Sequence, residues 1–583
     1  MTGNDEKIDN DVMLIKSEFL LSDHVPTLVL DYVSENDKKK ILDEDEPLDK
    51  KTKCANSKNR NILKGQNKSR GPTFKQEKVL TLCPKLIDIP LLGELPLCNI
   101  DKCKFLHDTS LYLSTKRPDI NEECYLFTTK GYCSRGITCR FGKSHLTEDG
   151  RNIKKADFVH NVSNSNFLTK ELQFSLRKRT YNFEKSNSCL KALDKRKIES
   201  TNISETCSTV NRLGYVEDHD IIRLRPQEKK TINWKNKLIL SPLTTVGNLP
   251  FRRICKEFGA DITCGEMALA SSLLQGMQQE WALVRRHQSE DIFGVQLCGN
   301  NPYVMTKCAQ LLQEKTDIDF IDVNLGCPID KIYEQGAGSG LLRRKRILEN
   351  VLYGMNNILN IPLTVKTRTG IYKDAYIAHD LIPHFVKCGV SLISIHGRTR
   401  EQRYTKLADW NYIDECAKLT KDIPVFGNGD VLSYIDYNEK LELYPHVSGV
   451  LIARGALYKP WLFTEIKEQR HWDISSSERM DIIKKYVNYG LEHWGSDDKG
   501  VENTRRFLLE WLSFLHRYIP VGLLERPPQK INQRPPVYKG RNDLETLFAS
   551  PNCKDWIKIS EMLLGPIPEE FHFLPKHKAS SWK

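Results

Sequence analysis

Short apolar segments alternate with longer amphipathic segments along the chain from Trp234 onward. The segments between the apolar runs have helical period; residues 375–388, for example, place Ile377, Leu381 and Phe385 on one face. Eight strands, each followed by a helix, favour an α/β fold closed into a (β/α)8 TIM barrel over an open sheet. The apolar segments predict these strands at 238–240, 262–264, 292–297, 320–324, 363–366, 392–396, 425–428 and 449–452.

The alternation ends near residue 473, where two longer amphipathic helices are expected. Residues 475–495 open with serines that can cap a helix, and residues 504–519 repeat the helical period. We therefore expect a barrel domain at 231–473 and a C-terminal helical domain at 474–583. Its basic residues either bind RNA or form a solvated surface; they are Lys484, Lys485, Arg505, Arg506, Arg517, Arg526, Lys530 and Arg534.

Two polar stretches precede the barrel. Residues 1–75 carry charge clusters and few aromatic side chains, which predicts a disordered arm. Residues 151–230 predict a basic linker with short helical pieces. Its basic clusters at 177–179 and 194–197 fit nuclear-import signals or RNA-facing charge, but such clusters are common, so a solvated linker is favoured.

The region between these stretches, 76–150, contains two groups of three cysteines and one histidine. Thiolates and imidazoles bind Zn2+, and a segment this short has no other core, so folding and zinc binding should be coupled. The groups resemble tandem CCCH zinc fingers, which bind single-stranded or looped RNA. The first group is Cys83, Cys98, Cys103 and His107, and the second is Cys124, Cys133, Cys139 and His145.

The spacing of these groups departs from the usual one, with fourteen residues in the first gap of finger one and five in the last gap of finger two. Aromatic and basic side chains lie among the ligands. They either stack on bases and neutralise phosphates or, for the aromatic ones, shield the zinc. They are Phe105, Phe127, Tyr132 and Phe141, with Lys102, Lys104, Lys130, Arg135, Arg140 and Lys143.

The overall charge and cysteine content narrow the choice of partner and compartment. A formal net charge of +12 favours a polyanionic partner, nucleic acid first. The 17 cysteines are odd in number and scattered, which indicates reduced thiols or metal ligands rather than a disulfide framework. No apolar signal or membrane-length run is present. We expect a soluble monomer of the cytoplasm and nucleus, away from membranes.

The loop after the predicted strand 320–324 holds a candidate acid. Gly326, Cys327 and Pro328 break the strand and place a thiol at its end. A thiol with an ordinary pKa of about 8.5 is mostly protonated at neutral pH and can donate a proton. The alternative is that Cys327 is a small buried residue beside a turn.

Functional groups of such a barrel gather at the C-terminal ends of its strands. The glycine-rich end of strand seven and Arg454 after strand eight suggest a pocket for the phosphate of flavin mononucleotide (FMN). Three other strand-end residues also have ordinary structural explanations. Gln296 could cap a strand, Lys366 could be solvated, and His396 could be a core histidine.

Together, the barrel motifs SPLTTVGNLPFRR, VQLCG, DVNLGCPID, VKTRTG, IHGRTREQ, GNGD and IARGAL resemble those of the tRNA-dihydrouridine synthases. With the fingers and the helical region, the resemblance is to the eukaryotic tRNA-dihydrouridine(47) synthase branch. It implies an FMN-dependent enzyme that uses NADPH to reduce a uridine of tRNA, at position 47, to 5,6-dihydrouridine. It also implies Cys327 as the acid and, as FMN-binding residues, Pro242, Leu243, Thr244, Gln296, Lys366, His396, Asn428, Gly429, Asp430, Ala453 and Arg454.

The mechanism that follows is hydride transfer from flavin N5 to uracil C6 and proton transfer from Cys327 to C5. Lys366 and His396 would orient the flavin and compensate developing charge. The basic residues after strand six either contact RNA phosphates or are solvated; they are Arg398, Arg400 and Arg403. A messenger RNA is a further candidate substrate.

Two other functions compete with this one. The first is an FMN barrel that acts on a free pyrimidine, as dihydroorotate dehydrogenases do; the fingers and the basic linker argue against it, because a free base has no phosphates. The second is an RNA-binding protein without catalysis, and the presence of Cys327, Lys366 and His396 argues against it.

Overall fold

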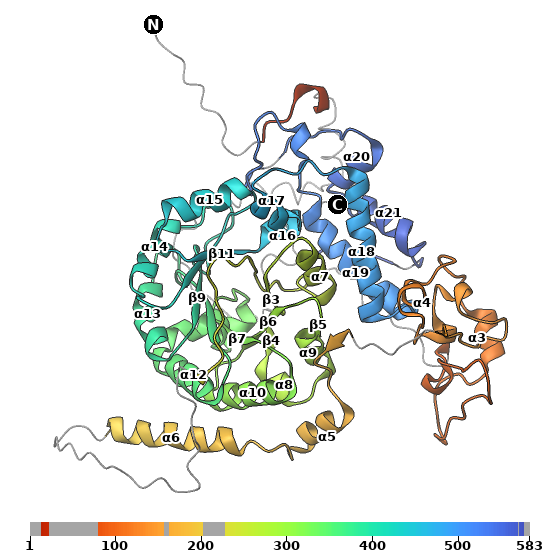
Figure 1. Cartoon of the computed structure of the whole chain (residues 1–583), viewed down its shortest axis with the longest axis horizontal. Coiled ribbons are helices and arrows are strands. Elements are labelled where there is room, and N and C mark those ends of the chain that lie inside the picture. Colours follow the sequence, from red (N-terminus) through yellow and green to blue (C-terminus); the bar gives the residue numbers. More distant parts are fainter. Residues whose placement is uncertain are drawn as a thin grey trace, which may run out of the picture.

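The structure is a computed structural model, and it describes residues 13–21, 80–156, 163–201, 228–533, 535–569 and 571–576. A barrel forms the largest body, the C-terminal helices pack along one side of it, and the cysteine-rich region lies beyond these helices (Figure 1). Most of the expected arm 1–75, namely residues 1–12 and 22–75, lies outside the described residues.

The barrel predicted from the alternating pattern is confirmed. Eight parallel strands close it, because β3 pairs with β2 on one side and β6 on the other, and a short strand β4 (Ala268–Leu269) adds to β6. The apolar runs formed these strands because both faces of such a sheet are buried. The eight are β2 (Ile239–Leu240), β3 (Ile262–Cys264), β6 (Ile292–Cys298), β7 (Phe320–Asn324), β8 (Leu363–Arg368), β9 (Leu392–His396), β10 (Val425–Asn428) and β11 (Gly449–Ile452).

Helices surround the strands and shield their outer faces. The predicted helix 375–388 is α13, which begins later, at Ala378, because Tyr376 still bridges to Gly370 in the preceding loop. The helices of the barrel are α7 (Leu249–Glu257), α8 (Ala270–Leu274), α9 (Gln278–Trp281), α10 (Pro302–Lys315), α11 (Asp330–Glu334), α12 (Lys345–Ile358), α13 (Ala378–Lys387), α14 (Trp410–Lys418), α15 (Tyr434–Leu443), α16 (Arg454–Tyr458) and α17 (Leu462–Glu468).

Aromatic side chains fill the part of the barrel interior near the N-terminal ends of the strands. Phe320 packs edge-on against Trp234, with ring centroids 5.5 Å apart. Gly294 on the neighbouring strand makes room for it, since a Cβ there would lie 2.2 Å from the Phe320 ring. The barrel is therefore a packed core rather than an open channel.

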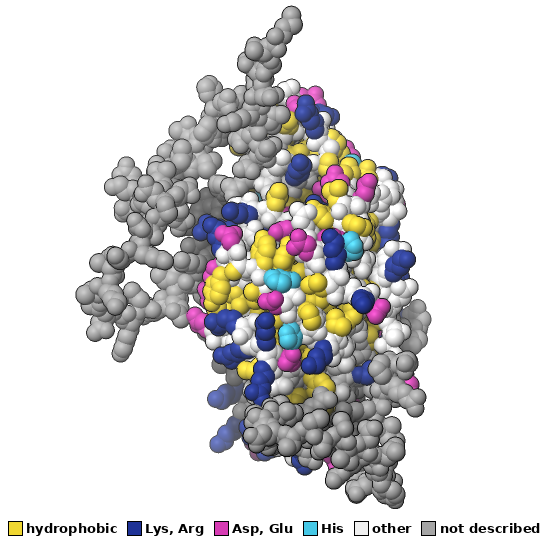
Figure 2. All heavy atoms as spheres, turned by 90° about the vertical axis from the view of Figure 1, so that its left-hand side faces the viewer, with side chains coloured by type: hydrophobic (Ala, Val, Ile, Leu, Met, Phe, Trp, Pro, Cys, Tyr) yellow, Lys and Arg dark blue, Asp and Glu magenta, His cyan; other side chains and the backbone are white. Residues whose placement is uncertain are grey.

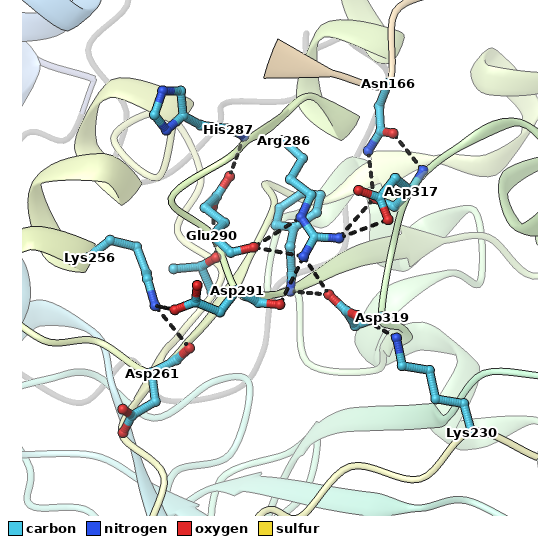
Figure 3. A network of polar contacts seen from close by, with 12 residues as sticks. Asn166, Lys230, Lys256, Asp261, Arg286, His287, Glu290, Asp291, Asp317 and Asp319 are labelled. Carbon is cyan, nitrogen blue, oxygen red and sulfur yellow. Dashed lines mark hydrogen bonds and ion pairs between the residues drawn. The ribbon is translucent and has the colours of Figure 1, made fainter. Parts of the chain in front are cut away.

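The opposite, N-terminal end of the barrel is held by a polar network (Figure 3). Arg286 donates to the carboxylate of Asp319 at 2.9 Å and to the backbone oxygen of Glu290 at 2.7 Å. Asn166, from the linker, bonds to the backbone of Asp317 in both directions. Because it lies at the N-terminal ends of the strands, this network serves stability rather than chemistry.

Part of the expected basic linker is structured and packs against the barrel. Its strand β1 (Asn164–Ser165) pairs antiparallel with β5 (Arg286–His287), and α5 (Lys170–Lys178) and α6 (Glu184–Thr201) follow. Ser186 of α6 donates to Gln310 of α10 at 2.6 Å, in a buried contact. The short helical pieces predicted here thus lie against the barrel wall.

The C-terminal helices pack on α7 and α16 of the barrel. The first begins with a capping box of Ser475 and Glu478, as its serines predicted. The second starts earlier than predicted because Asp497 caps it. Trp511 and Tyr486 join the helices to Phe251 of the barrel in one core. The helices are α18 (Ser476–Trp494), α19 (Asp498–Leu515), α20 (Asp543–Ala549) and α21 (Cys553–Leu564).

Two of the basic residues expected on an RNA-binding or solvated surface are instead buried. Arg505 donates to the backbone oxygens of Leu564 and Gly565 at the end of α21. Arg398, after β9, is paired with Asp430 at 2.6 Å. Both expectations were wrong for these two side chains, because each satisfies buried acceptors within the fold.

A short N-terminal segment packs on the C-terminal region. Met13 and Ile15 are buried beside Leu523 and Leu524, and Ile15 bridges antiparallel to Leu524. Part of the expected arm is therefore ordered, because its apolar residues cover an apolar patch of the helical region.

The side of the molecule over α13 to α15 shows basic, acidic and apolar side chains intermixed (Figure 2). His446 and Lys418 there both lie within 3.1 Å of Asp414. This face is an ordinary surface with locally balanced charge. Within the described ranges, no helix combines the length and apolar character needed to span a membrane.

Candidate active site and zinc centres

The Cys327 loop is fixed from three directions at the C-terminal end of β7. Asn324 accepts from the Cys327 amide at 2.9 Å, and Ser339 donates its hydroxyl to the Cys327 carbonyl at 2.7 Å. Arg368, at the end of β8, donates to the carbonyl of Gly326 at 2.8 Å. These contacts hold the thiol in one place, as a positioned acid requires.

Burial sets the protonation state of this thiol. Cys327 is only 7% exposed. Burial raises the pKa of the Cys327 thiol above its usual value, and the charges of Arg368 and Lys576 oppose this more weakly. The group therefore carries its proton at neutral pH and can deliver it as an acid.

A chain of two side-chain amides and one carboxylate links the Cys327 loop to the barrel interior. Asn324 donates to the side-chain oxygen of Gln296 at 2.8 Å, and Gln296 donates to Asp322 at 2.7 Å. Thr364 also donates to Asp322 at 2.6 Å. Burial raises the pKa of the Asp322 carboxyl. Gln296 thus caps no strand but orients Asn324, the residue that holds the acid loop.

Lys366 and His396 lie close to each other at the ends of β8 and β9. Lys366 is half-buried and donates to Asn428 at 3.3 Å; burial, with the charge of Arg368, lowers the pKa of Lys366 to about 8. Burial, with the charges of Arg368 and Lys366, holds the pKa of His396 well below its usual range. The imidazole is neutral, and its buried Nδ1 has no hydrogen-bond partner among the described residues.

The ends of β10 and β11 form a hollow with two arginines at its side. Asp430 accepts from Arg398 and from Arg454, the latter at 2.8 Å. Gly429 has φ +144°, and a Cβ there would lie 2.5 Å from that of Ala408, so no other residue fits easily. The hollow is lined by His396, Asn428, Gly429, Asp430, Val431, Leu451, Ala453, Arg454, Gly455 and Ile531.

The remaining predicted residues, Pro242, Leu243 and Thr244, follow β2 at the same end of the barrel. Pro242 reaches the barrel interior, where Cys264 and Lys366 are among its neighbours in a second hollow. The next residue, Thr245, has φ +78°, and its amide donates to Glu266 at 2.6 Å. A β-branched residue with such a φ is strained, and the Glu266 contact holds it there.

The two zinc groups differ in exposure. In each, the four possible ligand atoms lie within 4.8 Å of one another. Sulfur atoms are 4.0 Å apart for Cys83 and Cys103, and 3.8 Å for Cys124 and Cys139. Ligands on one tetrahedral zinc ion would lie about 3.8 Å apart. All four residues of the second group are buried, whereas His107 of the first is exposed.

The second group also has a suitable imidazole. His145 is buried, its Nδ1 lies 2.9 Å from Asn152, and its Nε2 has no partner among the described residues. A histidine held through one nitrogen presents the other to a metal. Phe127 lies against His145 and Phe141 is buried, so these two aromatics shield the centre. The donors in both groups fit zinc.

The comparisons with known proteins agree with this geometry. A family model described as Dihydrouridine synthase (Dus) matches residues 239–516, from the first barrel strand to the end of α19. A Xenopus laevis protein named tRNA-dihydrouridine(47) synthase [NAD(P)(+)]-like is 54% identical over 97% of this chain and 91% of its own. The chain belongs to the dihydrouridine synthase family. It is therefore an enzyme, an oxidoreductase, and a binding protein without catalysis is excluded.

Other relatives of this dihydrouridine synthase carry the same name. One from Homo sapiens is 51% identical over 89% of this chain and 84% of its own, and one from Arabidopsis thaliana is 40% identical over 87% and 86%. A solved structure, morphinone reductase in complex with tetrahydroNAD, matches with a TM-score of 0.30 and 10% identity, over 40% of this chain and 87% of its own.

The strand ends of this dihydrouridine synthase fit a bound FMN. A phosphate can enter the hollow beside Arg454, where Gly429 keeps the backbone open. The buried Nδ1 of His396, which has no hydrogen-bond partner in the part of the chain that the structure describes, can bind a polar group of a ligand. Asp430 also lines this hollow and accepts from Arg398 and Arg454, so it fixes these two arginines and offsets part of their charge.

The sequence analysis of this dihydrouridine synthase missed three residues that fix the acid loop. Asn324 and Arg368 both stand at strand ends, in DVNLG and VKTRTG, so the rule that selected Lys366 and His396 could have found them. Ser339 lies twelve residues beyond Cys327 in a 3-10 turn, and no local pattern marks its contact with that loop.

Proposed function

We propose that this dihydrouridine synthase reduces a uridine of tRNA, at position 47, to 5,6-dihydrouridine with FMN and NADPH. The substrate, the position and the nicotinamide coenzyme are those in the names of the relatives, and NADPH is chosen over NADH by family resemblance. The observation that carries the proposal is the buried, protonated Cys327 thiol, held by three contacts at the strand end where a barrel of this kind does its chemistry.

Bound FMN would supply the hydride that adds to C6 of uracil. Side chains of the protein supply the proton and the groups that stabilise the developing charge. Cys327 gives its proton to C5, so one hydride and one proton saturate the C5–C6 bond and leave a thiolate to be reprotonated. Lys366 and the neutral His396 would orient the flavin and compensate the charge that develops on the reacting groups, where burial strengthens such interactions.

The rest of the chain would bring the RNA to this site. The zinc fingers, each with its Zn2+, and the helical region would bind tRNA, and the target base would leave its stack to reach the barrel mouth. Lys102 and Lys104 of finger one are exposed, as phosphate-binding residues should be. We place the protein in the cytoplasm and nucleus as a monomer, with messenger RNA as a further substrate.

The test compares the wild-type protein with Cys327→Ala on unmodified tRNA. With FMN and NADPH, mass spectrometry should detect dihydrouridine for the wild type, and at least a hundredfold less for the variant, since general acid catalysis contributes about 10²–10⁴-fold. The variant should keep its flavin, because Cys327 bonds through its backbone.

Two outcomes would contradict the proposal. Equal product from the variant would remove Cys327 as the acid. Turnover of free uracil or orotate, but not of tRNA, would instead favour an enzyme of free pyrimidines.

A further inference from the structure

The last described residues form a strap that crosses from the C-terminal helices to the barrel mouth. We use the name strap for residues 565–569 and 571–576. Its start is fixed by Arg505, which donates to the backbone oxygen of Gly565 at 2.9 Å. Farther along, Phe573 is buried in the core shared by the barrel and the helices. The strap therefore follows a defined path.

The strap ends by placing one ammonium group at the mouth. The Lys576 amide donates to the carboxylate of Glu510 on α19 at 3.0 Å, which anchors the backbone. The Lys576 Nζ donates to the hydroxyl of Thr245 at 3.0 Å. Thr245 belongs to the loop after β2, directly after the predicted FMN-binding residue Thr244 and at the same end of the barrel as Cys327.

The surroundings of Lys576 leave this ammonium group partly unsatisfied. It is half-buried, and its side-chain hydrogen bond goes to a neutral hydroxyl. Across the described ranges, no carboxylate lies within ion-pair distance of its Nζ, in contrast to Lys459, which is paired with Glu465. An ammonium group has three N–H donors, so two remain for a ligand. A half-buried cation with a neutral partner favours an incoming anion.

The position of Lys576, on a segment that approaches the barrel from outside, indicates which anion it binds. The phosphate of the cofactor already has a candidate hollow beside Arg454. Lys576 comes from outside the barrel and contacts the loop after β2, at the end of the barrel that carries Cys327. The positive charge of Lys576 acts to lower the pKa of Cys327 and that of Glu266, the residue that holds the strained Thr245. Two anionic ligands arrive from outside, NADPH and the RNA. The strap belongs to the C-terminal region, which in the proposed function binds the RNA, so the RNA is the ligand that Lys576 would meet.

We propose that Lys576 binds a backbone phosphate of the tRNA nucleotide that enters the barrel mouth, and that the strap serves to hold it there. This inference rests on the proposed function. It makes Lys576 a substrate-binding residue for the second half of the reaction, in which flavin is reoxidised by tRNA. The first half, reduction of flavin by NADPH, should not involve it.

The experiment uses the full chain loaded with FMN and separates these two halves by stopped-flow absorbance. The variants are Lys576→Gln, which removes the charge, and Lys576→Arg, which keeps it. Lys558→Gln is the matched control, since Lys558 is an exposed lysine of α21 paired with Asp555. An unmodified tRNA transcript is the substrate, at several salt concentrations.

Lys576→Gln should raise the tRNA concentration for half-maximal flavin oxidation about tenfold, the effect of one charged hydrogen bond. Loss of one phosphate contact should also reduce the salt slope of that constant by about 0.7–0.9. The rate of flavin reduction by NADPH should stay unchanged. Lys576→Arg should restore both the affinity and the slope.

Three results would overturn the proposal. Lys576→Gln could behave like the Lys558→Gln control, or lose tRNA affinity with an unchanged salt slope. It could also release flavin, which would show that the strap only closes the cofactor site. A wild-type protein that reduces no uridine in tRNA would refute the proposed function itself, and this inference with it, before any variant is compared.

Discussion

At the scale of single residues, Lys366 shows how burial in the barrel changes the pKa of a side chain. The Lys366 side chain is half-buried and has Asn428 rather than a carboxylate as its hydrogen-bond partner. Burial, with the charge of Arg368, lowers the pKa of Lys366 to about 8, whereas an unfolded lysine has a pKa of about 10.4. The charged form is thus costly to bury, and an anionic ligand would relieve that cost.

The cost predicts a pH dependence of stability in the flavin-free protein. The burial penalty is fully present below about pH 8 and is relieved as pH rises toward 10.4, because the unfolded chain then binds more protons than the folded one. Lys366→Met removes the penalty. Its thermal midpoint should exceed that of the wild type by roughly 5 °C at pH 7, and the difference should shrink toward pH 10.

Thermal unfolding of both proteins between pH 7 and pH 10 checks this. Lys484→Met, at an exposed lysine, is the control and should differ from the wild type equally at every pH. If the thermal midpoint of Lys366→Met exceeded that of the wild type by an amount that grew with pH, Lys366 would not be a cation that is costly to bury.

At the scale of elements, the strands were predictable and several contacts between elements were not. The apolar runs located all eight barrel strands, because each is buried on both faces, and the serines before α18 located its start. Residues such as Ser339 and Ser496 carry no such signal. Their partners are fixed by how distant segments pack, which a period of two or 3.6 residues cannot encode.

Ser496 lies between α18 and α19 and contacts the second zinc group. Its hydroxyl is 3.1 Å from the sulfur of Cys139 and 3.4 Å from that of Cys133, and its carbonyl accepts from the Arg140 amide. A hydroxyl that donates to thiolates stabilises their negative charge and their orientation toward the metal. The helical region thus completes the surroundings of a zinc centre 357 residues away in sequence from Ser496.

Ser496→Ala should therefore loosen zinc in the second finger only. We expect zinc transfer to a chromogenic chelator to become about tenfold faster for that centre, within the range for lost outer-shell contacts, with the first finger unaffected. Ser114→Ala, an exposed serine of α3 (Thr109–Thr115), is the control. If zinc left the second finger of Ser496→Ala as slowly as it leaves the wild type, the hydroxyl would not stabilise the bound metal.

At the scale of the whole molecule, the second finger is attached to the helical region rather than free. Arg140 pairs with Asp498 at 2.5 Å, and the side chains are 10% and 12% exposed. Lys130, at the end of α4 (Tyr125–Lys130), pairs with Glu492. Basic residues expected to meet phosphates thus hold the finger in place, while those of finger one remain exposed.

Breaking the buried pair should release the fingers from the body. Arg140→Ala leaves Asp498 without its partner, and loss of one member of a buried pair costs about 3–5 kcal/mol. We expect faster hydrogen exchange at residues 495–500 and a larger radius of gyration by small-angle scattering. Lys143→Ala, which breaks an exposed pair with Glu122, is the control and should change neither. A compact Arg140→Ala protein would mean that other contacts suffice.

The packing of the N-terminal segments on the C-terminal helices also constrains how the chain is made. Met13, Ile15 and the second finger emerge from the ribosome first, yet the residues that cover them, Leu524 and Ser496 among them, are synthesised about 500 and 360 residues later. If the finger binds zinc during synthesis, the side that Ser496 covers stays exposed until the helical region has been made.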